Sequence, residues 1–176
     1  MERRTQNNVF PEDVLIPYFG IGNTITGIEI GVSGGSGSVG MLSRLLNLRL
    51  YCVDPWKHYY LSPYEAGLDQ SVHDIGYETA KNKIAEFGDR GVIIRATSNE
   101  AVDMVPDQVD FVFIDGHHEY YQVKLDIKNY LPKVRKGGLI AGHDYKQVPD
   151  VTRAVQELFP LDQIKEADDF IWYVTL

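Results

Sequence analysis

The sequence has little cysteine, a deficit of positive charge and no long apolar run. Cys52 is the single cysteine among 176 residues, so a disulfide within the chain is excluded. Lysine and arginine number 17 against 25 acidic residues, and this net charge of −8 argues against a nucleic-acid partner or an anionic membrane surface. No apolar run approaches the roughly 20 residues of a membrane span, and no signal-peptide pattern follows the charged start. We therefore expect a cytoplasmic protein.

The remaining composition is typical of a globular domain. Hydrophobic residues make up 44% of the chain and charged residues 24%. The length allows one domain with a sizeable core, and no linker or internal repeat interrupts it. We interpret residues 26–176 as that domain. The short segment 1–25 precedes it and could cover a binding site or form the contact of a homodimer.

Apolar strands and amphipathic helices alternate along the domain. The expected strands are 26–32, 48–54, 91–98, 108–116, 139–145 and 169–176, with 163–167 as a further candidate. The expected helices are 36–46, 77–88, 119–135 and one that Asp150 caps, and Gly137 and Gly138 are expected to end the third of them. Residues 57–75 are expected to be irregular. This alternation predicts an α/β fold, a doubly wound and mostly parallel sheet with helices on both faces.

Residues that could bind a ligand or take part in catalysis follow the ends of these strands. They are Gly31, Asp54, Ser98, Asp115, His143 and Asp144. The carboxyl ends of parallel strands meet at one edge of a sheet, and ligands bind there. We therefore expect these residues to share one site.

The stretch IEIGVSGGSGSVG, residues 28–40, holds five glycines directly after a strand. Such a loop lets a ligand approach the backbone and the N-terminus of the next helix. Asp54 ends the following strand and could accept hydrogen bonds from two ribose hydroxyls. Dinucleotide-binding and S-adenosylmethionine (SAM)-binding folds both use this arrangement. A dinucleotide fingerprint normally starts where the strand ends, but here G-x-G-x-x-G starts four residues after Gly31, at Gly35, so the register favours SAM.

With its second half included, the chain resembles the class I SAM-dependent methyltransferases. It is most similar to the Methyltransferase-24-like group of small-molecule O-methyltransferases, which is related to catechol and macrolide-sugar O-methyltransferases. The matching segments are 28–38, 51–56, 96–102, 109–145 and 150–159. The resemblance implies a Rossmann-like sheet of seven strands whose last strand is antiparallel.

The resemblance also implies roles for single residues toward SAM. Glu29, Gly31, Gly35 and Gly37 would line its methionine and ribose side, and Asp54 would take the ribose hydroxyls. Ser98 would lie near the adenine, and Asp115 would face the methyl group. The aromatic segment 55–67 is either a lid over this site, with Trp56 near the adenine, or a loop packed on the core.

Four residues, Asp115, His118, His143 and Asp144, are the catalytic candidates, and two routes to an activated acceptor stay open. A divalent metal such as Mg²⁺ could be held by Asp115, His143 and Asp144, although an imidazole departs from the oxygen ligands that Mg²⁺ prefers. Alternatively, a histidine could act as general base. Asp126 is expected to orient His118 or a nearby backbone group.

The sequence thus predicts a SAM-dependent methyltransferase that methylates an oxygen of a small molecule or sugar. Two alternatives belong to other classes. One is an NAD(P)-dependent oxidoreductase, which the register and the length disfavour. The other is a SAM- or sugar-binding module without turnover. Specificity in this fold lies in loops without transferable motifs, so the acceptor cannot be named.

Overall fold

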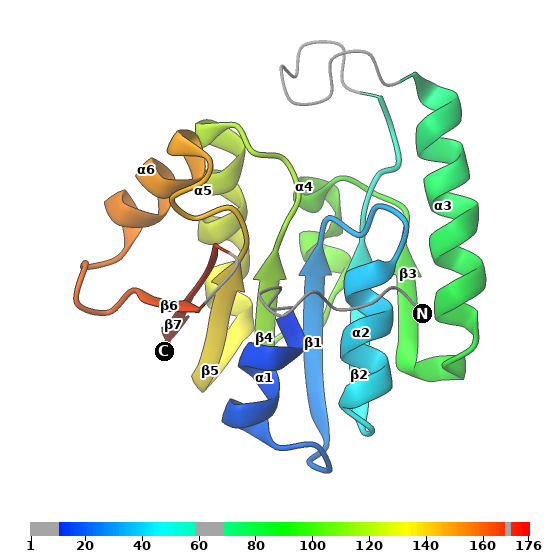
Figure 1. The fold of residues 1–176 in the computed structure, drawn as a ribbon, viewed down its shortest axis with the longest axis horizontal. Coiled ribbons are helices and arrows are strands. Elements are labelled where there is room, and N and C mark those ends of the chain that lie inside the picture. Colours follow the sequence, from blue (N-terminus) through cyan, green and yellow to red (C-terminus); the bar gives the residue numbers. More distant parts are fainter. Residues whose placement is uncertain (1–10, 59–68, 168–169) are drawn as a thin grey trace.

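A sheet of seven strands lies at the centre of the structure, a computed structural model that describes residues 11–58, 69–167 and 170–176 (Figure 1). The strand order is β3-β2-β1-β4-β5-β7-β6. The strands are β1 (Ile25–Ile30), β2 (Leu48–Val53), β3 (Gly91–Ile94), β4 (Val109–Ile114), β5 (Val134–Gly142), β6 (Lys165–Ala167) and β7 (Ile171–Thr175). Neighbouring strands from β3 to β5 pair in parallel, and β7 is antiparallel to both β5 and β6. This confirms the predicted fold, including the antiparallel last strand.

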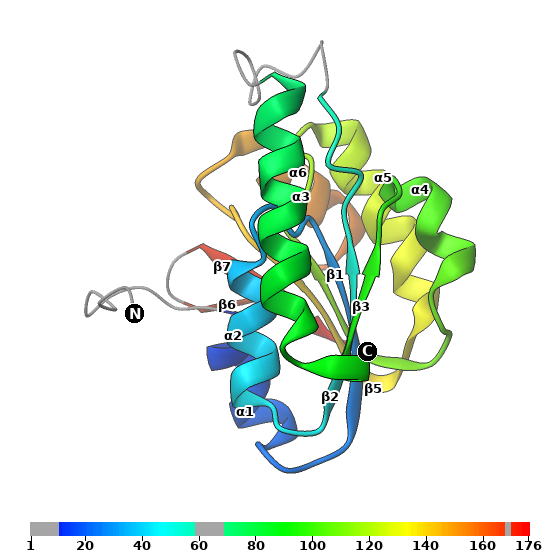
Figure 2. The same cartoon turned by 90° about the vertical axis from the view of Figure 1, so that its right-hand side faces the viewer.

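Helices cover both faces of the sheet (Figure 2). On one face lie α1 (Pro11–Phe19), α2 (Ser36–Arg44) and α3 (Gln70–Ala85), and on the other lie α4 (Ser98–Ala101), α5 (Tyr120–Tyr130) and α6 (Pro149–Leu158). The side chains of β4 alternate between two cores: Phe111 and Phe113 join the cluster under α2 and α3, whereas Val112 and Ile114 join the cluster under α5 and α6. Both faces are therefore buried, which is why the strands are apolar almost throughout.

Two element boundaries differ from the expected ones near the carboxyl ends of the strands. Helix α3 begins at Gln70 rather than at residue 77, because the Asp69 side chain caps it by accepting from the Ser71 amide at 2.8 Å. Strand β3 ends at Ile94 rather than at residue 98. Thr97 and Glu100 form a capping box there, which starts α4 instead.

Two further differences lie in the second half of the chain. Strand β5 begins at Val134 rather than at residue 139, so Gly137 and Gly138 lie within a strand and do not end a helix. Asp150 is not the cap of α6, since Val148 holds the N-cap position. The Asp150 carboxylate instead accepts a hydrogen bond from the Tyr120 amide at 3.3 Å.

Helix α1 lies in the predicted segment 1–25, of which the structure describes residues 11–25. Its Leu15 and Phe19 side chains are buried in the core, and the Tyr18 hydroxyl donates to the Gly137 carbonyl at 3.1 Å. In Figure 1 the helix lies beside the lower part of the strands, away from their carboxyl ends. Residues 11–19 thus complete the core, while the cap or dimer role of the whole segment stays a prediction. Within the described ranges, no helix combines the length and apolar character needed to cross a membrane.

Candidate active site

The glycine loop begins where β1 and β4 end side by side. Gly31 has a φ of +88°, and a Cβ atom built there would lie 2.1 Å from the backbone oxygen of Asp115. Only glycine fits this conformation and this approach. Gly35, with a φ of +79°, is the N-cap of α2 and packs on Ala80 of α3, where its Cβ would lie 3.1 Å from the Ala80 Cα. The two glycines therefore shape the loop through its backbone.

Glu29 lies beneath this loop in a buried position. Its side chain is 3% exposed, and one carboxyl oxygen accepts a hydrogen bond from the Ser38 hydroxyl. Burial raises the pKa of Glu29 to about 8, so the group is mostly protonated at neutral pH. A Cβ at Gly37 would lie 2.6 Å from its other oxygen. Glu29, Gly35 and Gly37 thus support the loop, and their predicted contact with SAM stays a prediction.

Asp54, after β2, ties the loop to the next strand. Its Oδ2 accepts from the amides of Val32 and Ser33, each at 2.9 Å, and its Oδ1 accepts from the Trp56 amide at 2.7 Å. A carboxylate has about four acceptor positions. Three are used by the backbone and about one remains, and the predicted contact of Asp54 with two ribose hydroxyls stays a prediction.

A cavity of about 580 Å³ opens at the carboxyl ends of the strands, within the usual size range of ligand sites. Gly31, Asp54, Trp56, Ser98, Asp115 and His118 all contribute to its wall. The Trp56 ring is 2% exposed, and its Nε1 donates to the Ser33 carbonyl at 2.8 Å. Residues 59–67 of the predicted lid lie outside the described residues. The cavity thus connects the glycine loop with the acids and histidines at the strand ends.

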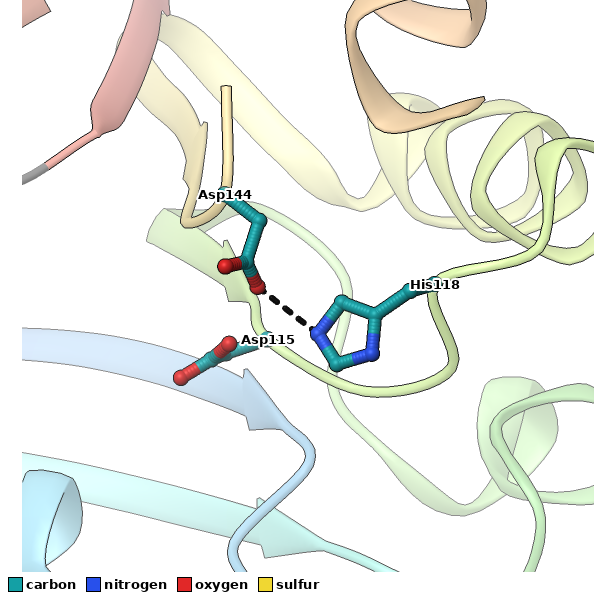
Figure 3. A group of neighbouring side chains, drawn as sticks. All are labelled: Asp115, His118 and Asp144. Carbon is teal, nitrogen blue, oxygen red and sulfur yellow. Dashed lines mark ion pairs between the residues drawn. The ribbon is translucent and has the colours of Figure 1, made fainter. Parts of the chain in front are cut away.

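Asp115, His118 and Asp144 form a cluster at this edge of the sheet (Figure 3). Asp115 follows β4 and Asp144 lies just beyond the neighbouring strand β5, so parallel pairing brings them together. The Nε2 of His118 lies 2.7 Å from the Oδ2 of Asp144. The Nδ1 of His143 lies 3.3 Å from the Oδ1 of Asp144 and 3.9 Å from Asp115. Asp144 therefore holds two imidazoles, one on each oxygen.

Burial and hydrogen bonds set the protonation of this cluster. Burial opposes ionisation of Asp144, but the hydrogen bonds from His118 and His143 outweigh it and lower the pKa of that carboxyl. The bond to Asp144 in turn raises the pKa of His118. Burial raises the pKa of Asp115 to about 6. Asp144 is thus the fixed negative charge of the site.

The cluster also has the spacing of a metal site. One ligand atom each from Asp115, His118 and Asp144 lies within 4.8 Å of the other two. This set contains His118 where the sequence suggested His143. Mg²⁺ fits it poorly, because Mg²⁺ prefers oxygen ligands and both Asp144 oxygens already face imidazole nitrogens. Two carboxylates and an imidazole suit metals such as Mn²⁺ or Zn²⁺ better.

Ser98 is the first residue of α4, and its side chain takes part in a hydrogen-bond network with Asp126 and Gln122. The Ser98 hydroxyl donates to the Oδ1 of Asp126 at 2.6 Å, and the amide of Gln122 donates to the same oxygen at 2.7 Å. We expected Asp126 to orient His118 or a backbone group, whereas the structure joins it to Ser98 and Gln122 and joins His118 to Asp144. Sequence reasoning missed Gln122, although its position four residues before Asp126 puts both on one helix face.

Comparisons with known proteins agree with this architecture. A family model described as a methyltransferase domain matches residues 28–145. A candidate caffeoyl-CoA O-methyltransferase from Staphylococcus aureus matches with a TM-score of 0.66 at 17% identity, over 92% of this chain and 79% of that one. An O-methyltransferase from Bacillus cereus, solved in complex with SAH, gives 0.62 at 16% identity, over 98% and 84%. At these identities the solved structures show the fold alone.

Curated relatives share shorter stretches. An uncharacterised protein of Acanthamoeba polyphaga mimivirus is 34% identical over 92 residues, which is 46% of this chain and 42% of that protein. The chain spans less than half the length of the curated relatives that it matches.

Proposed function

The chain belongs to the methyltransferase domain family, whose model matches residues 28–145, and we propose that it transfers the methyl group of SAM to a hydroxyl oxygen of a small molecule or sugar. The family and the fold confirm the prediction of a class I SAM-dependent methyltransferase. The NAD(P)-dependent oxidoreductase, kept as an alternative above, is overruled by the same family match. The family model names neither the methylated atom nor the acceptor class, which are therefore proposed from the site.

One observation carries the proposal: a single cavity joins the glycine loop to the acid and histidine cluster. At one end, the cavity wall offers the backbone of Gly31 and the remaining acceptor position of Asp54. At the other end it offers Asp115 and His118. SAM bound there would supply an electrophilic methyl carbon on its sulfonium sulfur. Asp54 would hold its ribose and Asp115 would lie nearest the reacting centre.

The cluster supplies the means to remove the acceptor's proton. Asp144 is ionised and can only accept, so the Nε2 of His118 donates to it. This tautomer, inferred from the hydrogen bond, puts the proton of a neutral His118 on Nε2. A carboxylate that fixes the tautomer of a catalytic histidine is a common arrangement. We assign His118 as the general base and Asp144 as the residue that positions it.

The donor set of Asp115, His118 and Asp144 fits Mg²⁺ poorly, so the proposed proton transfer does not require that ion. His143 contacts the second oxygen of Asp144 and would help to keep that carboxylate charged. A homodimer and a cytoplasmic location stay as proposals that the chemistry does not require.

The first test is calorimetric titration with S-adenosylhomocysteine (SAH), and with NAD as comparison. We expect SAH to bind and NAD not to bind. Turnover with SAM would then be screened over hydroxyl-bearing acceptors. His118→Asn and Asp144→Asn should keep SAH affinity and lower turnover by roughly 10²- to 10⁴-fold, the usual contribution of general base catalysis.

The control for these variants is Asp107→Asn, the same chemical change at a carboxylate that is 74% exposed and paired with Lys133 at 2.8 Å. It should leave turnover unchanged. A folded protein that binds neither SAH nor SAM would refute the proposal. Binding of SAH without turnover on any acceptor would instead favour the binding module.

A further inference from the structure

The two side chains of the His118–Asp144 pair come from two separate loops. His118 lies in the loop between β4 and α5, and Asp144 lies in the loop between β5 and α6 (Figure 3). Neither residue belongs to a strand, so the pairing of β4 with β5 does not by itself bring the Nε2 of His118 to 2.7 Å from the Oδ2 of Asp144. Other contacts must set the paths of both loops.

Helix α6 binds a backbone amide close to each member of the pair. Two residues after the histidine, the amide of Tyr120 donates to the carboxylate of Asp150 at 3.3 Å. Two residues after the aspartate, the amide of Lys146 donates to the hydroxyl oxygen of Thr152 at 2.8 Å. Asp150 and Thr152 both lie near the start of α6. One helix therefore fixes the backbone of both loops.

The aromatic side chains of these loops are bonded to the same helix. The hydroxyl of Tyr120 donates to Glu157, and the hydroxyl of Tyr145 accepts from the side-chain amide of Gln156 at 3.0 Å. Both tyrosines are buried in the hydrophobic cluster that also contains the buried face of α6, formed by Val151, Ala154 and Val155. Helix α6 is thus anchored in the core and can support both loops.

The loop that carries Asp144 needs such support, because its backbone adopts an uncommon conformation. Asp144 and Lys146 have φ values of +62° and +66°, in the left-handed region that residues other than glycine seldom adopt. Such a backbone persists only where the surrounding structure holds it. The bond from the Lys146 amide to Thr152 provides this support, and the Thr152 hydroxyl donates in turn to the Val148 carbonyl at 3.2 Å.

On the basis of the proposed function, in which His118 is the base, we propose that Asp150 and Thr152 are positioning residues of the methyl transfer. They act through the backbone of the two loops and keep His118 and Asp144 within hydrogen-bond distance. Neither residue is among those that line the cavity, so removing their contacts should leave the binding of SAH unchanged. A displacement of about 1 Å at a catalytic group can lower a rate by about 100-fold.

Four variants remove each contact and then restore it. Asp150→Ala and Thr152→Val remove the acceptor oxygens, whereas Asp150→Asn and Thr152→Ser keep one at each position. In crystal structures of the first two variants, the distance between His118 Nε2 and Asp144 Oδ2 should lengthen from 2.7 Å to beyond about 3.5 Å. Asp150→Asn and Thr152→Ser should keep the wild-type distance.

The kinetic readout separates positioning from binding and from general damage. Asp150→Ala and Thr152→Val should lower kcat by roughly 10- to 100-fold, while the KM for SAM and the affinity for SAH stay within about twofold of the wild type. In the His118→Asn background, where the pair is already broken, neither variant should lower kcat further. The conservative variants should restore kcat.

Two controls make the same chemical changes without touching either loop. Thr79→Val removes a hydroxyl of α3 that donates to the Ile75 carbonyl of its own helix at 2.7 Å, as the hydroxyl of Thr152 does to Val148. Asp107→Ala removes a carboxylate that is 74% exposed. Both variants should keep the wild-type distance and kcat.

The outcomes separate this inference from the function on which it rests. An unchanged distance in Asp150→Ala and in Thr152→Val would overturn the inference, and so would a wild-type kcat in a variant whose distance has lengthened. Circular dichroism tests folding, and if Asp150→Ala does not fold, Thr152→Val and Thr152→Ser decide alone. Absence of SAH binding by the wild type would instead overturn the proposed function. The crystallographic distances need neither SAM nor an acceptor, so they would still decide whether α6 positions the pair.

Discussion

Replacing Glu29 with glutamine should stabilise the protein, and this advantage over the wild type should grow as the pH rises. The Glu29 side chain is 3% exposed, and burial raises its pKa from 4.5 to about 8 despite the hydrogen bond from Ser38. Between these two values the folded state keeps a proton that the unfolded chain has released. The unfolded state binds fewer protons there, so the free energy of unfolding falls as the pH rises. Glu29→Gln keeps the shape of the side chain and removes the titration.

The magnitude follows from the two pKa values. One pKa unit corresponds to about 1.4 kcal/mol. At pH 7 the carboxyl is ionised in the unfolded chain and still protonated in the folded protein. Compared with low pH, where both states are protonated, this lowers the free energy of unfolding by about 3 kcal/mol. At pH 5 the free energy of unfolding is lowered by only about 1 kcal/mol. The difference, about 2–3 kcal/mol, is a large fraction of the stability of a typical domain.

The assay is urea unfolding of the wild-type protein and Glu29→Gln at pH 5, 6 and 7. Other titrating groups are common to both proteins, so subtracting one free energy of unfolding from the other isolates Glu29. We expect the advantage of the variant to grow by about 2–3 kcal/mol from pH 5 to pH 7. Two parallel curves, with the difference constant to within about 0.5 kcal/mol, would refute the assignment of a neutral Glu29.

Three further predictions concern the loop and the cluster. Gly31→Ala should destabilise the fold by more than about 3 kcal/mol in thermal unfolding, because its Cβ would lie 2.1 Å from the Asp115 backbone. Gly34→Ala, with open space around its Cβ, should change stability by less than about 1 kcal/mol. Asp54→Ala should weaken SAH binding by roughly 2–4 kcal/mol, and unchanged affinity in a folded variant would remove Asp54 from the ligand site. Treatment with EDTA should leave turnover unchanged, and loss with recovery on adding Mg²⁺, Mn²⁺ or Zn²⁺ would contradict His118 as the base.

The sequence predicted the sheet well because its strands are buried on both faces. Continuous apolar runs marked β1, β2 and β4 to within about two residues. The start of α3 was missed, because its cap is Asp69 in a region without helical periodicity. The start of β5 was missed for another reason: Gly138 looked like a helix stop. A Cβ there would in fact lie 2.6 Å from the Asp110 carbonyl, so close strand approach requires this glycine.

The sequence predicted that the site residues lie together at the strand ends, but it did not predict which side chains pair with each other. Strand order alone places Asp115 beside Asp144. The pairing of Asp144 with His118 depends on the path of the loop after β4, which no local pattern encodes. The same holds for Asp126, whose partner Ser98 comes from a different helix. Side-chain partners across loops are set by tertiary packing, which residue spacing does not reveal.

The hydrogen bonds around Asp54 have a practical consequence. Trp56 is joined to this carboxylate through its amide, and to the glycine loop through its indole nitrogen, which donates to Ser33. Trp56 also lies on the wall of the cavity, next to the carboxylate that we assign to the ribose. The second tryptophan, Trp172, is buried in β7, on the far side of β5 from this loop. Replacing Trp172 with phenylalanine would make the intrinsic fluorescence of the chain an optical record of occupancy, readable in real time without labelled cofactor.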